Sequence, residues 1–133
     1  DFDRNFGFGN INQKSLDAYN KLWDATEYAL EIIKPGISCK QIYESLSNNL
    51  FSGNIKNPVG RMGHGFGLQL TEPPSIMIDD NTILEKNMIL ALEPSIEIEN
   101  GLILVHEENV LITENGSSLL TTRTPKELPV INI

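Results

Sequence analysis

The sequence has 133 residues, of which 40% are hydrophobic and 21% charged, and its formal net charge is -8. This size and composition fit one folded domain and exclude an intrinsically disordered chain. The acidic balance argues against binding to nucleic acid or to an anionic membrane, because both require a cationic face. Cys39 is the only cysteine, so no internal disulfide forms, and we expect a cytoplasmic location.

The first residues suggest that the sequence is part of a longer chain. It opens on Asp1 and passes directly into the alternating segment 2–8, which predicts a strand. Natural domains rarely begin inside such an element without a polar lead. We therefore expect a truncated domain, and its exposed strand edge favours a homodimer.

Two helices are predicted in the first half. Apolar residues recur every three to four positions over 11–33, the spacing of a helix with one buried face. This pattern stops at Lys34-Pro35-Gly36. Ser38 followed by Gln41 matches a capping box and predicts a second, shorter helix that ends near Gly53.

The second half is predicted to form a sheet. Segment 51–65 contains many Gly, Asn and Pro residues, so we expect a loop there. Turn signals at Glu99-Asn100-Gly101 and Asn115-Gly116 predict antiparallel hairpins. The expected strands are 67–70, 88–98, 102–113 and 118–121. The order of the elements, with helices first and strands later, predicts a single α+β domain over 1–133. Its helices are expected on one face of a mostly antiparallel sheet.

Several residues have side chains that can bind metal and interrupt apolar segments. Glu93 lies in one apolar segment and Glu107 in another. A buried lone carboxylate is costly unless it is paired or bound to metal. Two carboxylates and one imidazole on one sheet face would suit a divalent cation. The candidates are Asp1, Asp3, His64, Glu93, Glu97, Glu99, His106, Glu107 and Glu108.

The same residues have simpler explanations. A single buried glutamate pairs with a basic side chain more often than with a metal. The basic residues available are Arg4, Arg61 and Arg123. His64 lies between two glycines, which also fits an ordinary loop histidine. The carboxylates that we expect to be solvated are Glu97, Glu99 and Glu108.

Five segments carry further information. They are Asp1-Phe2-Asp3-Arg4-Asn5-Phe6, Ile33-Lys34-Pro35-Gly36-Ile37, Arg61 to Leu68, Leu84 to Ile96, and His106-Glu107-Glu108-Asn109-Val110. In this order they resemble motifs of the C-terminal, pita-bread catalytic domain of the creatinase, prolidase, aminopeptidase P and methionine aminopeptidase superfamily. The resemblance covers nearly the whole sequence and implies a partial pita-bread fold with helices on a curved sheet.

The resemblance also implies a metal site. In that family two Asp, one His and two Glu hold two divalent metals about 3.5 Å apart. Asp1, His64, Glu93 and Glu107 match four of these ligands, while the family's first aspartate has no counterpart in this sequence. One metal would then keep its protein ligands, and the fragment alone is expected to be inactive. Manganese, zinc, iron and cobalt all suit such ligands.

Three positions depart from the family pattern. Thr71 replaces a histidine that stabilises the developing oxyanion, and its hydroxyl donates a hydrogen bond but does not titrate near neutral pH. The segment 68–72 resembles ectoine-hydrolase-type and dimethylsulfoniopropionate-lyase-type members. His106 stands where the family usually has Ile and should point away from the metal of Glu107, since neighbours on a strand face opposite sides. Asn87 replaces a turn glycine and tolerates the left-handed conformation.

The resemblance implies a metal-dependent hydrolase that cleaves a carbon–nitrogen bond in a dipeptide or small solute. Glu93 would be a metal ligand and proton shuttle, and Thr71 a hydrogen-bond donor at the catalytic site. Two alternatives stay open: a metal-dependent lyase acting on a small sulfonium solute, and a non-catalytic pita-bread binding module. The presence of all four ligand positions favours an enzyme.

Overall fold

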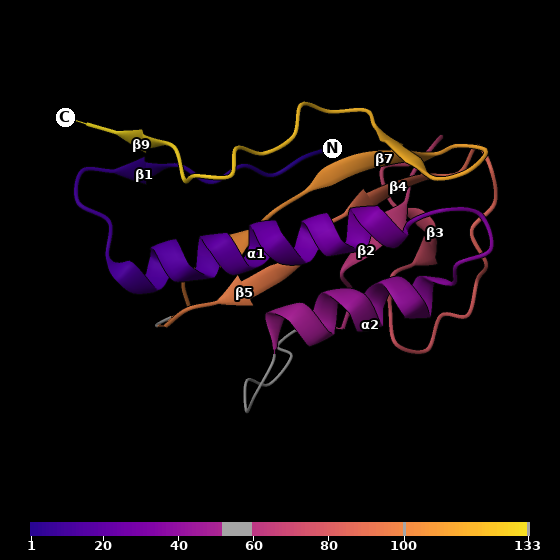
Figure 1. The fold of residues 1–133 in the computed structure, drawn as a ribbon, viewed down its shortest axis with the longest axis horizontal. Helices are drawn as coiled ribbons and strands as arrows, with labels where there is room; N and C mark the ends of the chain where they lie inside the picture. Colours follow the sequence, from indigo (N-terminus) through magenta and orange to yellow (C-terminus); the bar gives the residue numbers. More distant parts are fainter. Residues whose placement is uncertain (52–59, 100, 133) are drawn as a thin grey trace.

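The computed structural model describes residues 1–51, 60–99 and 101–132. Within them, α1 (Gln13–Ile32) and α2 (Cys39–Leu50) lie side by side on one side of a sheet (Figure 1). The strands are β1 (Gly7–Phe8), β2 (Gly63–Gly65), β3 (Glu72–Ser75), β4 (Ile89–Leu92), β5 (Ser95–Glu97), β6 (Ile103–Val105), β7 (Glu108–Ile112), β8 (Ser117–Leu119) and β9 (Val130–Ile131).

Both predicted helices are confirmed. Helix α1 begins after Asn12, whose side chain accepts a hydrogen bond from the Ser15 N–H at 2.9 Å. Helix α2 begins with the predicted capping box, in which Ser38 and Gln41 each accept a hydrogen bond from the other's backbone N–H, at 3.2 and 2.9 Å. Such a cap satisfies amide groups that have no partner inside the helix. The predicted end near Gly53 lies outside the described residues.

The main sheet has the strand order β3-β2-β4-β7-β8, and each neighbouring pair is antiparallel. Strands β5 and β6 form a separate hairpin, and β1 pairs with β9 in parallel. The two hairpins expected around 99–101 and 115–116 are therefore present. This arrangement confirms an α+β fold with a mostly antiparallel sheet.

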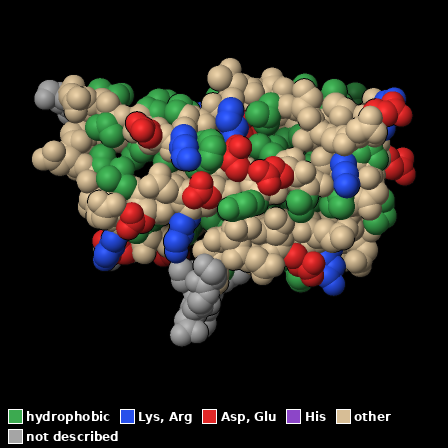
Figure 2. Space-filling view, in the orientation of Figure 1, with side chains coloured by type: hydrophobic (Ala, Val, Ile, Leu, Met, Phe, Trp, Pro, Cys, Tyr) green, Lys and Arg blue, Asp and Glu red, His purple; other side chains and the backbone are tan. Residues whose placement is uncertain are grey.

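The core lies between the helices and the sheet. Its members come from both helices and from the central strands, and include Leu22, Ala25, Ile42, Leu46, Leu90, Leu92, Val110 and Ile112. Burial of these side chains provides the main driving force for folding. Acidic and basic side chains alternate over the described part of the helical face, where lysines and arginines are scattered rather than gathered (Figure 2). None of the described helices combines the length and apolarity needed to cross a membrane.

Two strand predictions, for segments 2–8 and 67–70, were wrong over most of their length. Only Gly7–Phe8 of segment 2–8 is a strand, because side-chain hydrogen bonds rather than a strand ladder hold the preceding residues. Segment 67–70 consists of bends, and the strand begins later, at Glu72. The register between β2 and β3 shifts at His64 and Gly65, which is consistent with this delayed start.

The strand expected over 118–121 is present as β8, and two other predicted strands are interrupted. The strand expected over 88–98 divides into β4 and β5 around Pro94, which has no N–H to give to a ladder. The strand expected over 102–113 divides into β6 and β7 at His106 and Glu107. The predicted loop 51–65 contains a strand, Gly63–Gly65, where the described part of the segment enters the sheet. Each interruption falls next to a candidate ligand.

Glycine is required where β2 packs between its neighbours. A Cβ atom added at Gly63 would lie 2.4 Å from the main-chain oxygen of Ala91, and one at Gly65 would lie 2.5 Å from that of Pro73. These distances leave no room for a side chain on either side of His64. The two glycines therefore allow the close approach of the neighbouring backbone. Asn87 has φ 74°, which confirms its predicted left-handed conformation.

Candidate metal centre

Three of the four predicted ligands converge although they are far apart in the sequence. Asp1, His64 and Glu107 each offer one ligand atom, and these atoms lie within 4.8 Å of one another. His64 is on the inner strand β2, Glu107 immediately precedes β7, and the N-terminus lies near β7 (Figure 1). His64 and Glu107 are buried, whereas Asp1 is exposed. The cluster thus has one side open to solvent.

The hydrogen bonding of His64 leaves one ring nitrogen available. Its Nδ1 is 2.9 Å from the main-chain oxygen of Gly65. Because a carbonyl oxygen only accepts hydrogen bonds, we assign the ring proton to Nδ1, which leaves a lone pair on Nε2. Strand pairing holds His64 opposite Ala91 on β4 and Ser75 on β3. This is the tautomer that metal-binding histidines adopt when a carbonyl orients the ring.

Glu93 lies beside this cluster and is paired with arginine. It follows β4, and its N–H donates to the main-chain oxygen of Met62 at 3.0 Å. Its Oε1 is 3.1 Å from Arg61 Nε and 3.0 Å from Arg61 Nη2, as well as 3.9 Å from His64 Nε2. The ion-pair alternative considered for this glutamate is therefore realised. Glu93 is not among the three residues whose ligand atoms converge, although its carboxylate borders the His64 imidazole, and its role as a fourth ligand stays a prediction.

Glu107 is a buried carboxylate close to other negative charges. Its side chain is buried, and Oε1 has no hydrogen-bond partner among the described residues. Burial raises the pKa of Glu107, and the negative charges of Asp3 and Glu93 raise it further. A buried carboxylate oxygen without a partner is costly in a native protein. Two carboxylates and a histidine nitrogen form a donor set that fits a divalent transition-metal ion.

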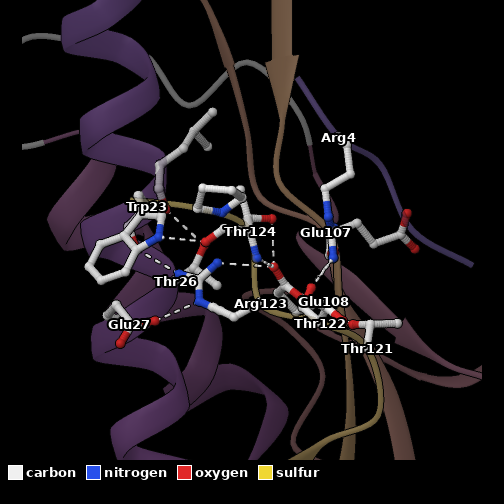
Figure 3. Close-up of polar contacts among 12 residues, drawn as sticks. Arg4, Trp23, Thr26, Glu27, Glu107, Glu108, Thr121, Thr122, Arg123 and Thr124 are labelled. Atoms are coloured by element: carbon white, nitrogen blue, oxygen red, sulfur yellow. Dashed lines mark hydrogen bonds and ion pairs between the residues drawn. The ribbon is translucent and has the colours of Figure 1, made fainter. Parts of the chain in front are cut away.

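Glu108 corrects the sequence analysis, which expected a solvated side chain. It is fully buried, and its carboxylate is surrounded by hydrogen-bond donors (Figure 3). Burial alone would raise the pKa of Glu108, but hydrogen bonds from Thr124 and the charges of Arg4 and Arg123 lower it overall. The missed signal was its period-two spacing with Val110 and Ile112, which are also buried. This glutamate faces away from Glu107, into a polar network beneath β7.

The remaining candidates lie outside the cluster. His106 is buried, and its ring packs edge-on against Tyr19 with 4.6 Å between ring centroids. Burial lowers its pKa to about 4, with a smaller contribution from the charge of Arg123, so the imidazole is neutral near pH 7. Glu97 and Glu99 are exposed, as expected. Thr71 is exposed just before β3, and its catalytic role stays a prediction.

Comparison with known proteins adds independent information. The family model described as "Metallopeptidase family M24" matches residues 1–114. A Xaa-Pro dipeptidase of Pyrococcus horikoshii is 34% identical over 132 residues, covering 96% of this chain and 36% of that protein. The crystal structure of dipeptidase PepE from Mycobacterium ulcerans superposes with a TM-score of 0.90 at 28% identity, covering 99% of this chain and 36% of that one.

A third relative has the same fold. The structure of X-Pro aminopeptidase from Thermotoga maritima superposes with a TM-score of 0.88 at 26% identity, covering 98% of this chain and 37% of that one. These similarities confirm the predicted partial pita-bread fold. The chain spans little more than a third of the length of the relatives it matches. The resemblance to ectoine-hydrolase-type and lyase-type members stays a prediction.

Proposed function

The chain belongs to metallopeptidase family M24, and on this premise we propose that it is the larger part of the catalytic domain of a metal-dependent hydrolase. The reaction proposed is cleavage of a carbon–nitrogen bond in a dipeptide or small solute. The dipeptidases among its relatives support this substrate class. The observations that carry the proposal are the convergence of Asp1, His64 and Glu107, and a buried oxygen of Glu107 that has no hydrogen-bond partner within the described part of the chain.

Four side chains would hold the metal: Asp1, His64, Glu93 and Glu107. Their donor set suits manganese, zinc, iron or cobalt, and two ions in the complete site. When bound, such ions polarise a carbonyl group and make water a stronger nucleophile near neutral pH. A homodimer and a cytoplasmic location remain predictions.

The protein side chains have distinct proposed roles in this reaction. Glu93 Oε1 would accept the proton that the attacking water loses and pass it to the leaving nitrogen. Arg61 holds this carboxylate through two contacts of 3.0 and 3.1 Å, which limits its rotation. The Thr71 hydroxyl would donate a hydrogen bond to the developing oxyanion. A threonine in this role supplies no proton, so Glu93 would be the main proton carrier.

Metal binding by this chain tests the site directly. We expect the chain to bind one Mn²⁺, measured by calorimetry and by the loss of the free Mn²⁺ electron paramagnetic resonance signal. Glu107→Gln should weaken binding by more than about 100-fold, since even outer-shell partners of metal ligands contribute about 10–100-fold. The matched control is Glu114→Gln, which changes an exposed carboxylate two residues beyond the end of β7, paired with Lys86. Equal affinities for both variants, or no binding by the chain, would contradict the proposed site.

Hydrolysis is best measured on the longest gene product that contains this sequence. We expect release of free proline from Xaa-Pro dipeptides, or of an amine from a small amide, only in the presence of the metal. Glu93→Gln in that protein should lower kcat by about 100-fold or more, the range of general acid–base catalysis. Glu97→Gln is the control, because Glu97 is exposed on β5. Full turnover by the Glu93 variant would exclude the proton-shuttle role, and cleavage of a carbon–sulfur bond instead would indicate a lyase.

A further inference from the structure

A buried carboxylate lies next in sequence to the proposed ligand Glu107. Glu108 Oε1 accepts hydrogen bonds from the Thr124 N–H at 2.8 Å, the Thr124 hydroxyl at 2.6 Å and Arg123 Nη1 at 3.0 Å. Its Oε2 accepts from Arg4 Nη2 and from the Thr121 hydroxyl, both at 3.1 Å. Figure 3 shows this carboxylate inside the network while the Glu107 side chain extends away from it. Fixing Glu108 therefore fixes which way Glu107 points.

Arg4 connects this network to the segment that carries Asp1. Besides Glu108, its guanidinium donates to the main-chain oxygens of Glu107 at 2.5 Å and Thr122 at 2.7 Å. Asn109 Nδ2 also donates to the main-chain oxygen of Asp1. Residues 1–6 belong to no described strand, so these side-chain contacts replace ladder hydrogen bonds. The position of Asp1 relative to Glu107 thus depends on the side chains of Arg4 and Asn109.

We propose that Arg4, anchored by Glu108, is a positioning residue that holds the Asp1 segment against Glu107 so that both carboxylates reach one cation. This inference rests on the proposed metal site. A planar guanidinium suits the role, because its several N–H groups bind a carboxylate and main-chain oxygens at the same time. A lysine ammonium would keep the charge but would lose this geometry.

Arg123 provides a matched comparison for Arg4. Both arginines contact the Glu108 carboxylate, at 3.0 and 3.1 Å, and their side chains are 18% and 17% exposed. Arg123 otherwise contacts α1, through Glu27 at 2.6 Å and the main-chain oxygen of Trp23 at 3.2 Å. Its other hydrogen bonds therefore go to the helix. Those of Arg4 go to the main-chain oxygens of Asp3 and Glu107, in the segments that carry proposed ligands, and to that of Thr122. Loss of either arginine leaves Glu108 with one cationic partner.

The test compares Arg4→Met with Arg123→Met, measuring Mn²⁺ affinity by calorimetry and stability by urea unfolding in EDTA. We expect both variants to lose similar stability. Only Arg4→Met should bind Mn²⁺ about tenfold more weakly, the lower end of the range for residues that orient ligands. The electron paramagnetic resonance spectrum of bound Mn²⁺ should also differ from that of the unsubstituted chain in Arg4→Met, but not in Arg123→Met.

The outcomes separate this inference from the proposed metal site. Equal affinity losses in the two variants, or no loss in Arg4→Met, would overturn the positioning role alone, because the unsubstituted chain would still bind. No Mn²⁺ binding by the unsubstituted chain would overturn both proposals. Should Arg4→Met not fold, Arg4→Lys with Arg123→Lys as its control makes the same comparison with the charge retained. A selective affinity loss in Arg4→Lys supports the proposal, and its absence contradicts it.

Discussion

Replacing Glu108 with glutamine is expected to lower the free energy of unfolding by about 3–5 kcal/mol, because removing one partner of a buried ion pair leaves the other charge without compensation. Two arginines, Arg4 and Arg123, depend on this carboxylate. The glutamine amide has nearly the same size, so loss of packing does not explain the effect. Urea unfolding of the metal-free chain at pH 7 measures it.

The difference in the free energy of unfolding between the original chain and Glu108→Gln should depend on pH, and this dependence provides a control. The pKa of Glu108 lies below its ordinary value of 4.5 in the native chain. A lowered pKa stabilises the native state above the unfolded pKa, and this contribution disappears as the pH falls through the native pKa. The gap between the original chain and Glu108→Gln should therefore be complete at pH 7 and narrow in acid, below pH 4.5. A gap that stays constant into strong acid would show that charge is not the cause.

Replacing Gly63 with alanine is expected to cost about 3 kcal/mol, at the upper end of the range for overpacked cores. The new Cβ would meet the Ala91 main-chain oxygen at 2.4 Å and Ile76 Cδ1 at 2.6 Å. A main-chain oxygen cannot rotate away as a side chain does, so β2 would have to move away from β4. His64, the next residue, would move with it. The loss of stability is measured by thermal unfolding, monitored by circular dichroism.

Gly116→Ala is the matched control for Gly63→Ala. Gly116 lies in the turn before β8, and no described atom is within 4 Å of a Cβ placed there. We expect this variant to keep both the stability and the Mn²⁺ affinity of the original chain. If the two alanine variants unfold alike, the close contact between β2 and β4 does not limit stability.

The helices were predictable because their signals are local. The capping box of Ser38 and Gln41 and the repeat of apolar residues over 11–33 act within a few positions of each other. The strands were harder, because β2 is made of residues that disfavour strands and is held by packing between β3 and β4. Pro94 was visible in the sequence, and its lack of an N–H should have divided the strand predicted over 88–98.

The candidate site, too, could be predicted only in part from the sequence. Spacing alone made Glu93 and Glu107 unusual, but only the family resemblance joined them to Asp1 and His64. The prediction that Glu108 is exposed to solvent was wrong because its counter-charges come from Arg4 and Arg123, which are 104 and 15 residues away. Such pairs have no spacing rule in a single sequence. Arg61 was named as a possible partner for Glu93, and the structure makes that contact.

The contacts of the N-terminal segment also determine when the site is complete during biosynthesis. Asp1 and Asn109 are 108 residues apart, and Arg4 and Thr122 are 118 apart. A ribosome adds about 5–20 residues per second, so residues near Asp1 emerge many seconds before the segments that hold them. Until then the first residues have none of these partners, and His64 can meet only part of the proposed ligand set. Capture of a metal at the proposed site would therefore follow synthesis of the segments around Asn109 and Thr122.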